Sequence, residues 1–398
     1  MTIKNLSSRS FAVAIPLMIL SLILIGCSRR ADQSSVEEAM TERVAPANKI
    51  TLYSWGEYFS PILLERFEKE TGIGVEYEVY DTSDEMREQI KSSPGEYDVV
   101  VMDDLALQRL RRTRVIRPLS LDLLPNSEHI DTKYLASGDS LDSGVSSLPY
   151  FWGTTLIAYN KKQISNPEHS WSLLFDSRVK NHVFFVEERM ECTENMLRFL
   201  GHPPSTEDAE QLSEAANKLM ELSLIQNARF GSDADGKDGL DDGSIWAGMI
   251  YNGDLAQALL QDTEDKIGYF YPKEGTTTWV DNFAVPKDTP RWKEAHKFIN
   301  FMMDPIVAAE SSTFVQFATA NKSAQAHLAK IDPDLLSSVV FSDGEARGST
   351  LTEGSPNRQR LIHDGWIALE KSWVSRDAAG QDAANQLTKL DESVSDSE

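Results

Sequence analysis

From Lys49 onward, short apolar segments alternate with amphipathic ones, a pattern that predicts strands and helices in turn. One helix is expected from Pro61, which suits the first helical position, to Gly72, which is a natural stop. Further elements are predicted as buried strands at 49–55 (KITLYSW), 75–80 (VEYEVY) and 97–102 (YDVVVM), and as a helix at 84–92. This β-α-β-α-β order indicates a parallel sheet with helices on its faces.

Two extended apolar segments follow, of which the first has no helix beside it. They are LPYFWGTTLIAYN (148–160) and TTTWVDNFAVP (276–286). We expect the chain to pass here twice between two α/β lobes, with a cleft at the carboxyl ends of the parallel strands, where ligands bind in such sheets. The predicted fold class is therefore α/β, with two lobes, mainly parallel sheets, helices on both faces and a ligand cleft at the hinge.

The remaining regular pattern completes these lobes. Asp254 is expected to cap the helix that follows the strand and turn of SIWAGMIYNG (244–253). Other helices are predicted at 171–175, 205–222 and 290–303, and other strands at 182–186 and 267–272.

The acidic stretch GSDADGKD (231–238) nearly fits a phosphate-binding loop, but Asp238 stands where Ser or Thr must bind magnesium. A calcium loop is excluded because Lys237 takes a ligand position and Ser244 stands where a bidentate Glu belongs. A solvated acidic loop is therefore predicted.

The chain begins with a targeting segment. Residues 1–26 contain two basic residues, no acidic one and an apolar run too short to span a bilayer, which predicts a signal peptide. The run ends at Leu24-Ile25-Gly26-Cys27, which resembles a bacterial lipobox and predicts that Cys27 is acylated at a membrane surface. The alternative is an ordinary signal peptide with a chance cysteine. Residues 27–48 are expected to form a polar tether, and 377–398 a flexible acidic tail.

Composition narrows the possible functions. The formal charge of −23 over 398 residues argues against nucleic acid as the main ligand. Two cysteines exclude a disulfide-dense framework and a four-thiolate metal site. The seven histidines form no His-x₃-His pair and no HExxH motif, GxSxG is missing, and Cys192 has no partner that would make it a nucleophile. The sequence therefore predicts no enzyme, no cofactor and no metal.

Aromatic and acidic residues occur together where the predicted strands end. This pairing fits an elongated organic cation, because carboxylates accept hydrogen bonds from ammonium groups and aromatic faces cover the methylenes between them. The clusters are Trp55-Gly56-Glu57-Tyr58, Asp103-Asp104, Glu187-Glu188-Arg189-Met190-Glu191, Tyr251-Asn252-Gly253 and Trp279-Val280-Asp281.

Most of these clusters also have a structural explanation that leaves the ligand out. These alternatives are packing of Trp55 and Trp279 in a core between the lobes, a helix-dipole role for Glu57, one exposed helical face for Glu188 and Glu191, and helix N-capping by Asp103 and Asp104.

From about Lys49 to Ser323 the sequence resembles the spermidine/putrescine-binding proteins of bacterial polyamine ABC importers. The resemblance rests on an ordered set of motifs: LYSWGEYFSPILLERFEKETGIGVEY, GEYDVVVM, LPYFWGTTLIAYN, SWSLLFD, GMIYNGD, YPKEGTTTWVDNFAVP and KFINFMMDPIVA. It implies the periplasmic binding protein fold (type II-like), in which a ligand is enclosed between two lobes and delivered to a membrane permease.

The resemblance also implies which positions contact the ligand. They are Trp55, Glu57, Tyr58, Glu188, Glu191, Tyr251, Trp279, Asp281 and Phe317. Glu188, Tyr251 and Phe317 replace the Asp, Trp and Tyr usual in the family. The loop at Asp103 departs further, because Asp103, Asp104 and Ala106 stand where the family has Ser and tyrosines; Asp103 remains a candidate ligand residue.

We therefore expect a monomeric, lipid-anchored periplasmic protein that binds a polyamine and feeds an ABC importer. The expected lobes are 49–155 with about 281–325, and 156–280 with about 326–376. One alternative is a polyamine sensor subunit for a membrane signalling protein, which could have the same site. A lower alternative is a ferric-ion-binding protein of the same architecture, although Tyr269-Phe270-Tyr271 supplies no adjacent tyrosine pair.

Overall fold

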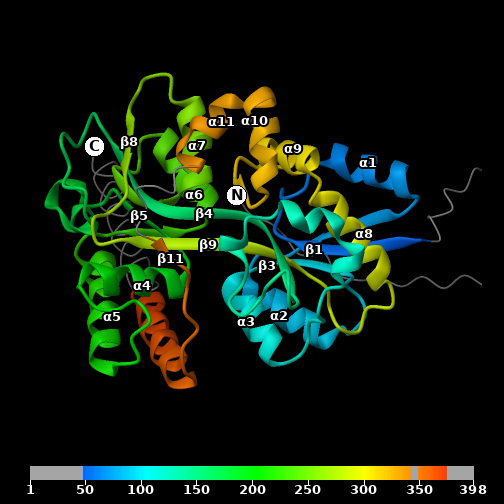
Figure 1. Ribbon diagram of the computed structural model, residues 1–398. Coiled ribbons are helices and arrows are strands. Elements are labelled where there is room, and N and C mark those ends of the chain that lie inside the picture. Colours follow the sequence, from blue (N-terminus) through cyan, green and yellow to red (C-terminus); the bar gives the residue numbers. More distant parts are fainter. Residues whose placement is uncertain (1–47, 342–347, 374–398) are drawn as a thin grey trace, which may run out of the picture. The chain divides into compact units, whose positions relative to one another are not determined.

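A computed structural model of the chain describes residues 48–341 and 348–373 (Figure 1). The predicted signal peptide, Cys27, nearly all of the tether and the acidic tail lie outside these residues. None of the helices in the two described ranges combines the length and the apolar composition needed to cross a membrane.

The described strands form one hydrogen-bonded sheet whose central members are two long crossing strands, β4 and β9 (Figure 1). The main order is β2-β1-β3-β9-β4-β7-β5-β6, with β8 and β10 paired to β4 and β11 paired to β9. The strands are β1 (Lys49–Ser54), β2 (Gly74–Val79), β3 (Val99–Asp103), β4 (Ser147–Asn160), β5 (Val183–Val186), β6 (Arg229–Gly231), β7 (Ala247–Tyr251), β8 (Ile267–Phe270), β9 (Thr276–Ala284), β10 (Ala318–Thr319) and β11 (Gly348–Ser349).

The α/β fold class is confirmed, and the sheet is mixed where the sequence predicted mainly parallel pairing. β1 runs parallel to β2 and β3, and β5 runs parallel to β6 and β7. In contrast, β9 is antiparallel to β3 and β4, and β4 is antiparallel to β7. The physical reason is that the chain crosses from one parallel group to the other in β4 and returns in β9.

Most helices begin where the sequence pattern places them. α1 starts at Pro61 and ends before Gly72, whose φ of 70° gives the left-handed turn that glycine favours. Residues 171–175 form a 3₁₀ helix, and residues 356–373 are helical as well. The α-helices are α1 (Pro61–Thr71), α2 (Ser83–Ser92), α3 (Asp104–Arg112), α4 (Arg189–Phe199), α5 (Ala209–Leu224), α6 (Asp233–Asp241), α7 (Asn252–Gln261), α8 (Trp292–Met302), α9 (Pro305–Val315), α10 (Gln325–Ile331) and α11 (Pro333–Ser337).

Two local predictions are wrong. The expected acidic loop is helix α6, which begins with a reciprocal capping box between Ser232 and Asp235. Asp254 does not cap α7, because this helix starts earlier and Tyr251 is its N-cap residue. Asn252 stabilises the early start: its side-chain amide accepts a hydrogen bond from the Thr154 N–H at 3.1 Å and donates one to a carbonyl at 3.1 Å.

A buried ion pair joins the helix at 356–373 to α4. The Arg358 guanidinium is fully buried and donates to the Glu194 carboxylate at 3.0 Å. It also donates to the backbone carbonyls of Pro204 at 2.7 Å and Thr206 at 3.0 Å. Buried charges need this degree of hydrogen bonding, since desolvation otherwise makes them destabilising.

We predict that Arg358→Ala lowers the free energy of unfolding by about 3–5 kcal/mol, because the substitution leaves the buried Glu194 carboxylate without its main partner. The matched control is Arg360→Ala, an exposed arginine on the same helix, which should change the stability by less than about 0.5 kcal/mol. Urea denaturation of the two variants measures both values. Equal stability of the variants would show that the buried pair does not anchor this helix.

Candidate functional site

β3 and β9 place two candidate carboxylates beside each other. Asp103 and Asp281 are direct partners in the register of these antiparallel strands. Asp103 also caps α3, since its carboxylate accepts a hydrogen bond from the Ala106 N–H at 2.8 Å. Asp103 is therefore a helix cap, as the alternative predicted. In this position Asp103 also lies next to Asp281.

The Asp281 carboxyl group is nearly enclosed, with 7% of the residue exposed. The Tyr58 hydroxyl donates a hydrogen bond to it, and the Trp55 side chain is a second partner. Glu57, between these two aromatics in sequence, is exposed and has a φ of 56°, an uncommon backbone angle for a residue other than glycine. This turn brings Tyr58 to Asp281 and leaves Glu57 toward solvent.

A second carboxylate lies on α4. Glu191 is 3% exposed and accepts hydrogen bonds from the Thr155 hydroxyl and, at 3.1 Å, from the Tyr251 hydroxyl. The alternative that Glu188 and Glu191 form one exposed helical face is therefore wrong. Glu188 is the N-cap residue of α4, and its side chain is accessible although protein surrounds it on most sides.

A row of aromatic rings connects the two carboxylates. The Tyr251 ring meets Trp279 edge to face at 6.0 Å between centroids, and Trp279 meets Phe317 at 5.0 Å. Phe317 in turn lies 6.1 Å from Tyr58, which hydrogen-bonds Asp281. Trp55 and Trp279 are both partly buried and pack against the hydrophobic core, so each has one part in the core and another part accessible.

β4 runs beneath this row. Alternate residues of a strand face the same side, so its positions 151, 153 and 155 lie under the site in order. Their separation along the strand corresponds to about 13 Å between the Asp281 end and the Tyr251–Glu191 end. The register pairs are Phe151–Asp281, Gly153–Trp279 and Thr155–Tyr251.

Two glycines that the sequence reasoning missed allow the rings to approach the backbone. A Cβ on Gly153 would lie 2.2 Å from Cζ2 of Trp279, and one on Gly253 would lie 1.9 Å from Cε1 of Phe317. Both distances are far below van der Waals contact, so only glycine fits. The available signal was their position inside the FWGTT and YNGD motifs, beside the aromatic residues of the site.

The site concentrates negative charge. Burial raises the pKa of Asp281 to about 7, and the neighbouring Asp103 raises it further. Burial, with Asp103 and Glu191 nearby, raises the pKa of Glu188 to about 8. Burial also raises the pKa of Asp104 to about 7. A bound cation favours the ionised form of such buried carboxyl groups.

Arginines of the protein oppose these carboxylates in part. Arg198 lowers the pKa of Glu191, and Arg109 is acted on by Asp103. Arg189 lowers the pKa of Glu188, but its Nη2 is bound to Oδ2 of Asp84 at 2.8 Å. Cys192 is buried beneath the site, and burial raises the pKa of its thiol well above the usual range. Among the described residues, no three His, Cys, Asp or Glu side chains are grouped to hold a metal ion.

Comparison with known proteins places this arrangement in a family. The profile of the family described as bacterial extracellular solute-binding protein matches residues 63–336, more than half of the chain. The chain belongs to this family of solute-binding proteins. As a member, it is a non-enzymatic binding protein.

Similar solute-binding proteins have been characterised in several bacteria. The chain is 31% identical to the putrescine-binding periplasmic protein SpuD of Pseudomonas aeruginosa (strain UCBPP-PA14), over 70% of this chain and 80% of that protein. It is also 31% identical to the spermidine/putrescine-binding periplasmic protein of Escherichia coli (strain K12), over 70% and 79%. The crystal structure of the spermidine/putrescine ABC transporter substrate-binding protein PotD from Streptococcus pneumoniae superposes with a TM-score of 0.69 at 26% identity, covering 82% of this chain and 99% of that one.

The raised pKa values predict how the stability of this solute-binding protein depends on pH without ligand. Between about pH 4 and pH 8 the unfolded chain loses protons that Asp281 and Glu188 keep in the fold, so stability falls as pH rises. We expect the thermal midpoint to decrease from pH 5 to pH 8, and to decrease less in Asp281→Asn. Calorimetry at a series of pH values measures this. An identical pH dependence in both proteins would contradict the assignment to Asp281.

Proposed function

We propose that this chain is an extracytoplasmic polyamine-binding protein that delivers its ligand to an ABC importer. The observation that carries the proposal is the row of aromatic rings from Tyr58 to Tyr251, with a buried carboxylate at each end, Asp281 and Glu191. An elongated cation with an apolar middle and charged ends has the matching distribution of chemistry.

The expected contacts follow from the chemistry of ammonium groups. One ammonium would donate hydrogen bonds to Asp281 and another to Glu191, each worth roughly 1.5–3 kcal/mol. Methylenes would pack on Trp279 and Phe317, and an ammonium over an aromatic face gains about 0.5–2 kcal/mol. Less the cost of ordering a flexible ligand, such contacts leave about −8 kcal/mol, near micromolar affinity.

Glu188 and Asp103 supply further charge beside this row. Asp103 raises the pKa of Asp281 and of Glu188, so the two residues favour a ligand with more positive charge. The named specificity of the relatives is consistent with this chemistry, since they are called putrescine- and spermidine/putrescine-binding proteins.

We also propose that binding closes two lobes around the ligand, with residues 49–155 and about 281–325 in one, and 156–280 and about 326–376 in the other. β4 and β9 are the crossings between the proposed lobes. Along the chain, Tyr58 and Asp103 precede β4, whereas Glu188 and Tyr251 follow it, so each proposed lobe contributes residues to the site. A ligand held from both sides stabilises the closed state by its differential affinity.

The direct test is isothermal titration of the protein with putrescine, spermidine and norspermidine. We expect binding, and we expect Asp281→Asn to weaken it by at least 1.5–3 kcal/mol, because one charge-assisted hydrogen bond is lost. The matched control is Asp265→Asn, an exposed aspartate whose partner is Lys161, which should leave the affinity unchanged.

Two results would count against this proposal. Heat from none of the three polyamines would reject polyamine binding, and unchanged affinity of Asp281→Asn would show that Asp281 does not hold an ammonium. Trp279→Ala and Trp55→Ala should also weaken binding while the protein stays folded by circular dichroism; unfolding of both would return them to a core role.

We further propose that acylated Cys27 anchors this extracytoplasmic protein to a membrane. The support is the lipobox-like Leu24-Ile25-Gly26-Cys27 at the end of an apolar run. We expect Cys27→Ser to move the protein from the membrane fraction to the soluble fraction when it is produced in a bacterium. An unchanged distribution, together with an unmodified Cys27 by mass spectrometry, would reject the anchor.

A further inference from the structure

A pocket of opposite charge adjoins the acidic site, without including the residues of the aromatic row. It is a pocket of about 490 Å³, within the size range of small-molecule sites. Among the described residues that line it, Glu353 is the only one with a carboxylate. Six cationic side chains line it: Arg87, Lys91, Arg109, Arg112, Arg189 and Arg360.

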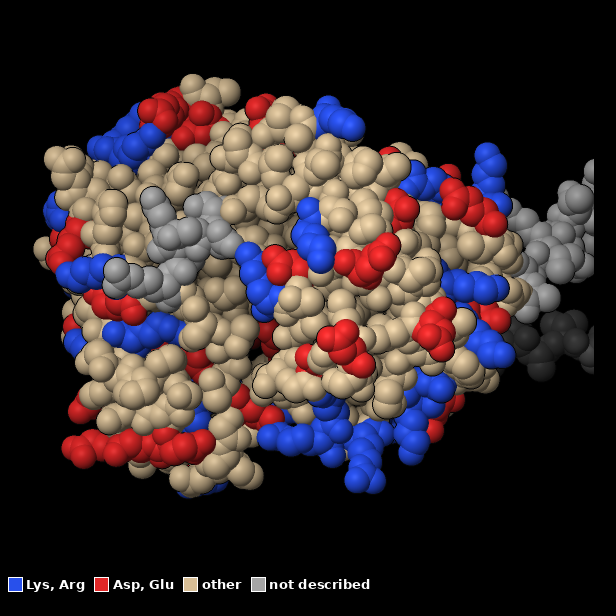
Figure 2. All heavy atoms as spheres, in the orientation of Figure 1, with Lys and Arg blue, Asp and Glu red and all other residues tan. Residues whose placement is uncertain are grey.

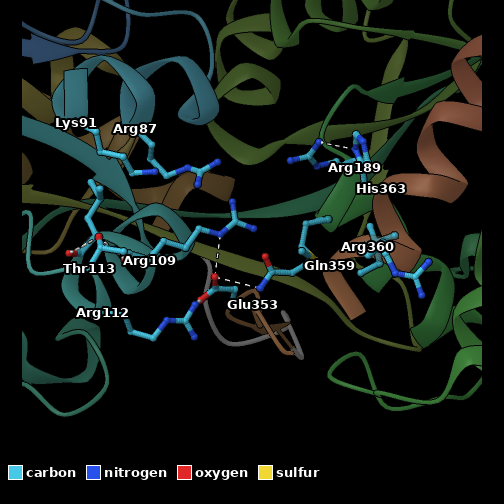
Figure 3. A pocket seen from close by; sticks show the side chains of 13 residues that line it. Arg87, Lys91, Arg109, Arg112, Thr113, Arg189, Glu353, Gln359, Arg360 and His363 are labelled. Atoms are coloured by element: carbon cyan, nitrogen blue, oxygen red, sulfur yellow. Dashed lines mark hydrogen bonds and ion pairs between the residues drawn. The ribbon is translucent and has the colours of Figure 1, made fainter. Parts of the chain in front are cut away.

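The cations come from separate elements and meet around the same space. Figure 3 shows Arg87 and Arg109 extending from one side and Arg189 with His363 facing them from the other, with Glu353 below the gap between them. Arg87 belongs to α2 and Arg109 to α3. Figure 2 shows Lys and Arg side chains gathered over these two helices. In a protein of formal charge −23 this basic pocket is a local exception.

The ion pairs inside the pocket do not balance its charge. Asp84 is shared by Arg87, Arg189 at 2.8 Å and Arg109 at 3.7 Å. Glu353 is shared by Arg109 at 3.1 Å and by Arg112. Two carboxylates therefore serve four guanidinium groups.

Within these ion pairs, the guanidinium groups of the described residues outnumber the carboxylates. Asp103 and Glu188 act on Arg109 and Arg189 without an ion-pair contact and offset part of this excess. The remaining cations each have a carboxylate of their own: Lys91 pairs with Glu88 at 3.0 Å and Arg360 pairs with Asp364 at 3.2 Å. They therefore do not add to the excess.

The excess charge sits where solvent screens it poorly. Only 15% of each of the Arg87 and Arg109 side chains is exposed. Burial and the neighbouring Arg87 and Arg189 lower the pKa of Arg109. The Nε–H of Arg87 is buried and has no hydrogen-bond acceptor among the described residues. An unfilled donor beside unbalanced guanidinium groups is the condition that a bound anion relieves.

We propose that this pocket binds a small organic dianion, a phosphomonoester or a dicarboxylate, at a position distinct from the aromatic row. Guanidinium groups bind both carboxylate and phosphate with paired hydrogen bonds, and the arginines shared between Asp84 and Glu353 have donors left for such a ligand. The apolar body of the ligand would contact Leu110, Met190 and Ile362, which also line the pocket. Arg189 follows Glu188 directly, so the two sites adjoin without sharing a ligand residue.

The test is isothermal titration of the full protein with glycerol 3-phosphate and with succinate, at constant ionic strength set by chloride. We expect saturable binding of at least one, and the one that binds identifies the headgroup. In Arg87→Gln/Arg112→Gln the affinity should fall about tenfold or more, since each substitution removes a charge-assisted donor. Arg178→Gln, an exposed arginine paired with Asp176, is the matched control and should bind as the original protein does.

No binding of either anion would overturn the proposal, as would binding that the double variant retains in full. Polyamine titration of the double variant separates this result from the proposed function, because its polyamine affinity should be unchanged. A thermal melt without ligand tests whether the double variant is folded. If the double variant is unfolded, the titration uses Arg112→Gln alone, because the Arg112 side chain is 60% exposed.

Discussion

The site depends on a concentration of carboxyl groups that the protein's own arginines neutralise only in part. Asp281 and Glu191 are almost completely enclosed, and Glu188 and Asp103 lie near enough to raise neighbouring pKa values. Desolvation and like-charge repulsion both oppose ionisation, so this arrangement costs folding free energy near neutral pH. A cationic ligand reverses both costs, which gives the ligand a large share in the stability of the site.

The fold makes this concentration possible through its two crossing strands. β9 carries Trp279 and Asp281, and β4 pairs with it so that alternate positions lie under the site. Residues hundreds of positions apart, such as Tyr58 and Asp281, thereby come into hydrogen-bond contact. β4 and β9 run antiparallel to each other because the chain crosses between the two parallel groups of strands in one and returns in the other. This double crossing therefore produces both the mixed sheet and the site.

Much of this could be predicted from local sequence. The strand ends were predicted because apolar runs stop at acidic and aromatic residues, and helix capping was one of two roles considered for Asp103 because it precedes a predicted helix. The burial of Glu191 and the need for Gly153 depend on the register between distant strands, which a single sequence does not contain. The basic pocket could not be predicted either, because its arginines come from separate helices whose packing a single sequence does not contain.

Whether the acidic site is a desolvated cation-binding site can be measured by proton release. Asp281 and Glu188 have pKa values of about 7 and 8, so both are partly protonated at pH 7 in the free protein. A bound polyamine requires the ionised form. Titration of spermidine at pH 7 in buffers of different ionisation enthalpy should show a net release of protons on binding. Binding without proton release, or with proton uptake, would contradict the account.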